Sequence, residues 1–144
     1  MAKKKKKKRR GKFNAKGCRY KGIWYDSTAE KNYSIFLEHL VEIGQLKSYV
    51  PHPPSCQLGP DVKWKIDFIV TDNDDKEFYV EYKGLATASY RIKLKVYKKY
   101  KPKPLIVVKQ LKVGVEYGIL AEVDTEALNS TVTHILKKKQ TPAT

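Results

Sequence analysis

The sequence predicts an α/β domain in which helices flank a central mixed β-sheet. Three features lead to this prediction: a helical pattern after residue 27, two apolar runs joined by an Asp- and Asn-rich turn within residues 63–84, and a wholly apolar run at residues 105–108. The last run is short and follows two prolines, which is typical of a central strand buried on both faces. The 144 residues suffice for one core, so we expect a single domain over residues 17–139 and a flexible tail over 140–144.

The positive charge is strong and concentrated at the N-terminus. The chain has 30 Lys and Arg against 15 Asp and Glu, and residues 1–16 hold ten of these bases and no acid. Because this segment repels itself and has little apolar surface to bury, we predict a disordered arm. We expect the arm to contact DNA phosphates, and the alternative is a solubilising or nuclear-targeting tail. The predicted contacts are Lys3, Lys4, Lys5, Lys6, Lys7, Lys8, Arg9 and Arg10.

A capping box marks the start of the first helix. Ser27 is followed three residues later by Glu30, and Gly44 then marks the expected end of the helix. Upstream, residues 17–25 are expected to contain a short extended piece. Downstream, residues 46–50 are a candidate strand, and the four prolines that follow predict an irregular loop. The predicted buried stripe of the helix is Tyr33, Phe36, Leu37, Leu40 and Val41.

Charged residues interrupt the two strands of the predicted hairpin. Asp67 lies within the apolar run of residues 63–70, and Glu81 and Lys83 lie on the second run. The side chains of Glu81 and Lys83 share one sheet face, because strand periodicity is two. Two close carboxylates repel each other unless a cation lies between them, so the pattern predicts a Mg²⁺ or Mn²⁺ site suited to phosphodiester hydrolysis. The alternative is a solvated strand face with Asp67 paired locally.

The segment at residues 90–96 alternates apolar and basic residues, which by periodicity alone indicates a strand. We nevertheless predict a helix over residues 89–100, because Tyr90, Leu94 and Tyr97 also fit one helical face. Further on, residues 113–121 are expected to add a strand, and Asp124 is expected to cap a last helix that reaches Lys137. The basic residues of the predicted helix 89–100, all expected to contact DNA, are Arg91, Lys93, Lys95, Lys98 and Lys99, of which all but Lys93 share a face.

These motifs, taken in order, resemble the PD-(D/E)xK nuclease superfamily. More narrowly, the chain is similar to small phage-encoded endonucleases related to Holliday-junction resolvases. The matching stretches are residues 22–30, 65–68, 80–84 and 87–95. One departure is that Lys65-Ile66 precedes Asp67, where the superfamily name implies a proline. The resemblance implies a restriction-endonuclease-like core, a helix over residues 89–100, and a phage protein that acts in the host cytoplasm.

The resemblance also implies roles for individual residues. Asp67, Glu81 and the backbone carbonyl of Tyr82 would hold Mg²⁺ or Mn²⁺, and Lys83 would act beside the attacking water. In the nucleases that this chain resembles, a glutamate of the first helix contributes to the metal site, which points to Glu30. Its place in the capping box offers the alternative that Glu30 serves only as a helix cap.

We therefore expect a divalent-metal-dependent DNA endonuclease that is selective for branched DNA, as Holliday-junction resolvases are. Cutting two strands symmetrically about a junction favours a homodimer. Two alternatives remain at this point. One is a nicking or restriction-type nuclease of the same superfamily. The other is a non-catalytic basic protein that binds RNA or the ribosome, which accounts for the charge but leaves Asp67 and Glu81 without a role.

Other classes of protein find little support in the sequence. No apolar run approaches eighteen residues and no apolar core follows the basic start, so neither a membrane segment nor a secretory signal is expected. We expect an intracellular protein in which Cys18 and Cys56 stay reduced. His52 lies four residues before Cys56, but a zinc site would need a second pair of closely spaced ligands.

Overall fold

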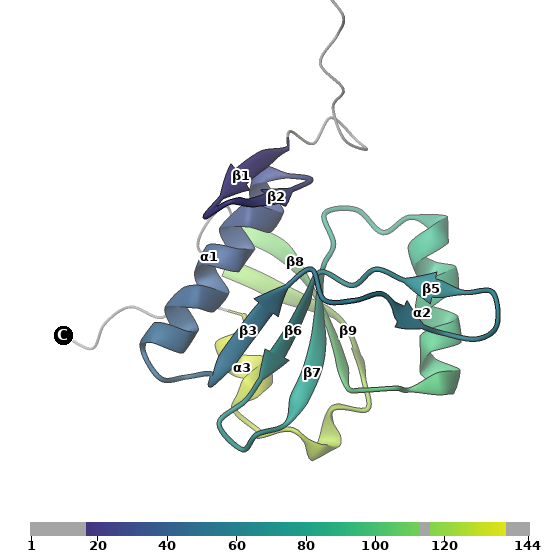
Figure 1. Ribbon diagram of the computed structural model, residues 1–144. Helices are drawn as coiled ribbons and strands as arrows, with labels where there is room; N and C mark the ends of the chain where they lie inside the picture. The colour runs from purple at the N-terminus through teal and green to yellow at the C-terminus, as the bar shows by residue number, and fades with distance from the viewer. Residues whose placement is uncertain (1–16, 113–115, 138–144) are drawn as a thin grey trace, which may run out of the picture.

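Five strands form the central sheet, in the order β3-β6-β7-β8-β9 (Figure 1). They are β3 (Ser48–Pro51), β6 (Phe68–Thr71), β7 (Glu77–Tyr82), β8 (Leu105–Lys112) and β9 (Glu116–Val123). Strands β7 and β8 run parallel, whereas the other neighbours are antiparallel. The predicted α/β domain with a central mixed sheet is therefore confirmed.

The computed structural model describes residues 17–112 and 116–137. The predicted basic arm, the predicted tail and the first residues of the strand expected at 113–121 lie outside this part of the chain. Within the described residues, no helix has both the length and the apolar character needed to cross a membrane.

Helices cover both faces of the sheet, and the strand residues alternate between two cores (Figure 1). Helices α1 (Thr28–Glu42) and α3 (Val132–Ile135) pack on one face, and α2 (Ala88–Tyr100) packs on the other. All four residues of the apolar run at 105–108 are fully buried, with Ile106 and Val108 toward α1 and Leu105 and Val107 toward α2. The prediction of a central strand buried on both faces is thus confirmed.

Helix α1 has the boundaries that its capping signals predict. Ser27 has an extended backbone, and its Oγ accepts a hydrogen bond of 3.0 Å from the N–H of Glu30. At the other end Gly44 has φ +79°, the left-handed conformation that commonly ends a helix. Of the predicted stripe, all but Val41 are buried, and Val41 packs against the same core as a half-buried residue.

A small hairpin packs against the start of α1. Its strands are β1 (Cys18–Tyr20) and β2 (Ile23–Tyr25), joined by a tight turn in which both central residues have positive φ. The hydroxyl of Tyr25 bonds to the buried Oγ of Ser34 at 2.8 Å, and that Oγ lies 3.2 Å from the hydroxyl of Tyr49 on β3. This buried network ties the hairpin to α1 and to the edge of the sheet.

The prediction that residues 89–100 form a helix is confirmed, since α2 spans Ala88–Tyr100. The Oγ1 of Thr87 caps it by accepting a bond of 3.1 Å from the N–H of Tyr90. Tyr90 and Tyr97 are both buried and contact Trp64, with ring centroids 6.1 and 5.9 Å away. Packing of these rings explains why the helix forms in spite of the alternating pattern.

The expected strand over residues 63–70 is interrupted. Strand β5 (Lys63–Trp64) pairs with β4 (Cys56–Gln57) in a separate ribbon, so the proline-rich segment also contains a short strand. Ile66 lies in the core beneath α2, whereas Phe68 lies in the core beneath α1. In a continuous strand residues 66 and 68 would face the same side, so the pleat has to break at Asp67.

The last helix differs from the prediction that Asp124 caps one helix reaching Lys137. Asp124 has φ +56° and makes no capping bond, and only a 3₁₀ turn (Thr125–Ala127) follows. The side chain of Asn129 then accepts bonds of 2.9 and 2.8 Å from the N–H and hydroxyl of Thr131. This local turn competes with helical hydrogen bonding, so α3 begins only at Val132.

Candidate active site

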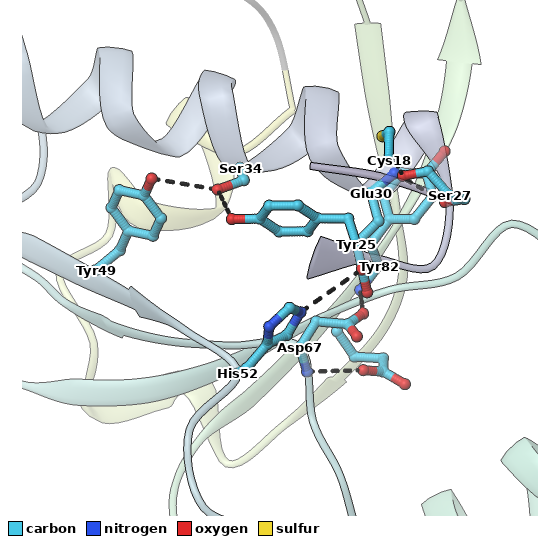
Figure 2. A network of polar contacts seen from close by, with 10 residues as sticks. Cys18, Tyr25, Ser27, Glu30, Ser34, Tyr49, His52, Asp67 and Tyr82 are labelled. Atoms are coloured by element: carbon cyan, nitrogen blue, oxygen red, sulfur yellow. Dashed lines mark hydrogen bonds and ion pairs between the residues drawn. The ribbon is translucent and has the colours of Figure 1, made fainter. Parts of the chain in front are cut away.

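The two predicted carboxylates meet where β6 begins and β7 ends. Phe68 pairs with Val80 in the β6–β7 register, which places Asp67 beside Glu81. The N–H of Asp67 donates a 3.0 Å hydrogen bond to Oε1 of Glu81, and the N–H of Tyr82 donates one of 2.8 Å to Oδ2 of Asp67 (Figure 2). Each carboxylate is therefore held by the backbone of the opposite segment.

Lys83 lies next to this pair. Its Nζ is 3.2 Å from Oε2 of Glu81, whose side chain is only 3% exposed. The same Nζ lies 5.5 Å from the centre of the Tyr90 ring, so the ammonium is held between a carboxylate and an aromatic face. The backbone N–H of Lys83 donates to the carbonyl of Val108, which continues the pairing of β7 with β8. The side chain of Lys83 remains partly open to solvent.

Glu30 reaches the same cluster from the first turn of α1. It is 9% exposed, and its Oε2 lies 3.8 Å from Nε2 of His52 (Figure 2). Its carboxyl is also close enough to Asp67 to raise the pKa of that residue. The structure thus brings together Glu30, Asp67, Glu81 and Lys83, which lie on three separate segments.

Sequence reasoning missed His52 as a member of this site. Its spacing in the chain associates it only with Cys56, as a possible zinc pair, but the Cys56 thiol is free and buried in the core beneath α2. The imidazole of His52 instead lies beside Glu30 and against the Tyr25 ring, with centroids 5.1 Å apart. The available signal was a polar residue between Pro51 and Pro53, directly after a strand.

The neighbouring carboxyl groups of the cluster favour the binding of a cation among them. Burial of the Asp67 carboxyl raises its pKa well above the usual range, and the carboxyls of Glu81 and then Glu30 raise it further. Lys83 faces Glu81 and offsets part of this negative charge. A divalent cation at Asp67 would reverse the repulsion and favour the ionised carboxylate.

The donor atoms of the cluster are of the type that binds a hard cation. Carboxylate and carbonyl oxygens are the ligands that Mg²⁺ and Mn²⁺ take in proteins. As the side chains stand, no three His, Cys, Asp or Glu residues within 17–112 and 116–137 are arranged to hold a metal ion. The Asp67 carboxylate accepts a bond from the N–H of Tyr82, and the Glu81 carboxylate accepts one from the N–H of Asp67 and also contacts Lys83. Binding a cation therefore requires these carboxylates to turn.

The expected basic face is present on α2. The 13 residues of this helix include five Lys or Arg and no acid. Lys93 is half-buried, which agrees with its predicted separation from the others. The helix begins five residues after Lys83, so the basic face belongs to the segment that follows the candidate site. Its exposed bases are Arg91, Lys95, Lys98 and Lys99.

The remaining predicted contacts, Lys3 to Arg10, lie outside the described residues. Any function assigned to the chain rests on the chemistry of the cluster and on the basic helix beside it. No family model, no curated protein and no solved structure matches this chain.

Proposed function

We propose that the protein is a divalent-metal-dependent DNA endonuclease. The observation that carries this proposal is the cluster of Asp67, Glu81 and Lys83, in which a carboxylate just before β6, a carboxylate on β7 and one ammonium meet at the end of the sheet. We further propose that the sheet is a restriction-endonuclease-like core, in line with the resemblance of these motifs to PD-(D/E)xK nucleases.

Each group would have a distinct task. Asp67, Glu81, Glu30 and the carbonyl of Tyr82 would hold Mg²⁺ or Mn²⁺, which when bound lowers the pKa of a water and neutralises phosphate charge. Lys83 would orient the attacking water and stabilise the negative charge that develops on the phosphate oxygens. The exposed bases of α2 would hold the DNA backbone near the cut.

A purely DNA-binding or RNA-binding role explains the basic charge but not the cluster. Glu81 is buried, and the pKa of Asp67 is raised by burial and by its acidic neighbours, so keeping these carboxyls together opposes folding. Arrangements of this kind are concentrated at functional sites. Among DNA substrates we propose branched forms, cut by a two-fold dimer with paired sites.

The test is cleavage of linear, nicked, flapped, single-stranded and four-way DNA, each with and without Mg²⁺. We expect Mg²⁺-dependent cutting that is fastest on four-way DNA, and a dimer by light scattering. Asp67→Ala, Glu81→Ala and Lys83→Ala should each lower the rate by about two to four orders of magnitude. The variants should stay folded and bind DNA, slightly more tightly where a carboxylate is removed.

Glu77→Ala is the matched control, because Glu77 is an exposed carboxylate on the same strand but at its far end. It should keep wild-type activity. Cleavage within a few-fold of wild type in all three site variants would contradict the catalytic assignment of Asp67, Glu81 and Lys83. A monomer that cuts linear duplex as fast as junctions would contradict only the choice of branched DNA.

A further inference from the structure

His52 is held in place by contacts of both its backbone and its side chain. Its backbone N–H donates a 2.8 Å bond to the carbonyl of Asp67, which extends the pairing of β3 with β6 by one residue. Its φ is +51°, a left-handed conformation that Gly or Asn adopts at lower cost. Any residue with an N–H could make the backbone bond, so the backbone alone does not call for an imidazole.

The orientation of the imidazole is set by packing. The ring lies 5.1 Å from that of Tyr25 at an interplanar angle of 49° (Figure 2). Tyr25 is itself held by its hydroxyl, through the buried Ser34 and Tyr49. A network from three separate elements therefore determines which way the ring of His52 points.

The ring points toward the carboxylate cluster. Nε2 of His52 lies 3.8 Å from Oε2 of Glu30, while the backbone of the same residue is bonded to Asp67. This distance is longer than that of a hydrogen bond. Contacts of this kind are often long in a ligand-free site and shorten when the site is filled. The side chain of His52 is 29% exposed, so the contact lies at the rim of the cluster.

We infer that His52 is a positioning residue, whose Nε2 holds the Glu30 carboxylate toward Asp67 and thereby sets the affinity for a divalent cation. This inference rests on the proposed metal-dependent function. It assigns His52 no contact with the reacting atoms. Groups that orient metal ligands in this way typically change metal affinity or activity by about 10- to 100-fold when they are removed.

Two substitutions separate this role from a structural one. His52→Asn keeps a residue that tolerates positive φ, but its short side chain does not reach Glu30. His52→Gln is less suited to the backbone, but its amide N–H extends to about the position of Nε2. A residue needed only for the fold would be replaced better by Asn, whereas a positioning residue would be replaced better by Gln. His134→Asn is the control, because His134 is exposed on α3.

The first measurement is Mn²⁺ binding by calorimetry in the absence of DNA, together with thermal melting in chelator. We expect His52→Asn to lower Mn²⁺ affinity by about 10- to 100-fold, with a melting temperature close to that of wild type. His52→Gln should recover affinity to within a few-fold, and His134→Asn should match wild type. In cleavage assays His52→Asn should need correspondingly more Mg²⁺, with a nearly normal rate at saturating Mg²⁺.

Several results would overturn the inference: wild-type Mn²⁺ affinity in His52→Asn, equal losses in the Asn and Gln variants, or no Mn²⁺ binding by the wild-type protein. A loss of Mn²⁺ affinity in His52→Asn that is accompanied by a marked fall in melting temperature would also overturn the inference. Failure of the proposed function looks different. If the protein binds Mn²⁺ in a His52-dependent way but cuts no DNA, the nuclease proposal fails and the positioning role stands.

Discussion

At the scale of single residues, Asp67 has both a structural role, at the break between two cores, and a chemical role, in the carboxylate cluster. The chain changes from the α2 core to the α1 core between Ile66 and Phe68, so Asp67 lies in a break and not within a strand. The break leaves its carboxyl beside Glu81 and near Glu30. The same geometry that allows both cores to fill therefore gathers the acidic groups.

The raised pKa of Asp67 gives a prediction about pH. The folded-state pKa lies above the unfolded value of about 3.9, so in chelator the associated stability is fully present below about pH 4 and is lost as pH rises through the folded pKa. Asp67→Asn cannot ionise, so its melting temperature should exceed that of wild type above the folded pKa. Melting curves from pH 4 to 9 measure this difference.

Divalent cations should change this profile. Because a proton competes with the metal for the carboxylate, Mg²⁺ should stabilise the wild-type protein more as pH rises, and should have little effect on Asp67→Asn. Asp61→Asn, at an exposed position, is the control and should behave as wild type. Identical pH profiles for wild type and Asp67→Asn in chelator would show that the carboxyl is not destabilised by its neighbours.

Glu30 allows its two candidate roles to be separated. Glu30→Gln retains a side chain that serves in a capping box but removes the charge that a metal would need. If Glu30 is a ligand, thermal stability in chelator should not fall, because the substitution removes a charge that opposes ionisation of Asp67. Mg²⁺-dependent cleavage should fall by about 100-fold or more, beyond the range for partners of metal ligands. Glu42→Gln, at the exposed end of the same helix, is the control. A fully active Glu30→Gln protein would show that Glu30 is only a cap.

At the scale of elements, α2 illustrates how packing decides between two local patterns. Its apolar and basic residues alternate, yet Tyr90 and Tyr97 lie seven residues apart and both contact Trp64 from the β5 segment. A helix places residues seven apart on one face, which a strand would not. The helical form thus buries both rings and leaves four of the five basic side chains exposed.

The basic face of α2 should contribute to DNA binding through phosphate contacts. Replacing Lys95 or Lys99 with alanine should lower the slope of log affinity against log salt by up to about 0.9 for each lost contact on duplex DNA. The loss should be similar for all sequences. Lys76→Ala is the control, because Lys76 is exposed in the turn before β7, at the opposite end of that strand from Lys83. An unchanged slope for both α2 variants would place the DNA elsewhere.

At the scale of the whole molecule, the mixed sheet brings distant segments to one end. The parallel pairing of β7 with β8 requires a crossover, and α2 supplies it immediately after Lys83. The end of β7 is thereby joined to the basic helix, while α1 brings Glu30 from the other face. The candidate site exists only because these elements converge.

The N-terminal segment should act separately from this site. Deleting residues 1–10 removes eight positive charges, so affinity should fall for every form of DNA and the salt slope should become smaller. Single-turnover cleavage at saturating protein should barely change, because Asp67, Glu81 and Lys83 are retained. Deleting the uncharged residues 140–144 is the control and should alter neither quantity. A large loss of the saturated cleavage rate would show that the segment takes part in the reaction.

Features that depend on near neighbours in the chain could be predicted from the residues alone. The limits of α1 follow from Ser27 and Gly44, and the β6–β7 hairpin follows from two apolar runs around a polar turn. Asp67, Glu81 and Lys83 were also recognisable as candidates, because charges stand out in apolar runs. Glu30 was a candidate ligand only through the resemblance, since its own surroundings indicate a helix cap. Local hydrogen bonds and periodicity control such features, so they are visible within a few residues.

Features that depend on which side of a segment is buried became visible only in the folded protein. The break at Asp67 follows from packing on both faces of the sheet, because Ile66 and Phe68 enter different cores and periodicity does not record this change. His52 joined the site for the same reason, because its neighbours Tyr25 and Glu30 are more than twenty residues away in sequence. Contacts between distant segments depend on the whole fold, and no short stretch of sequence contains them.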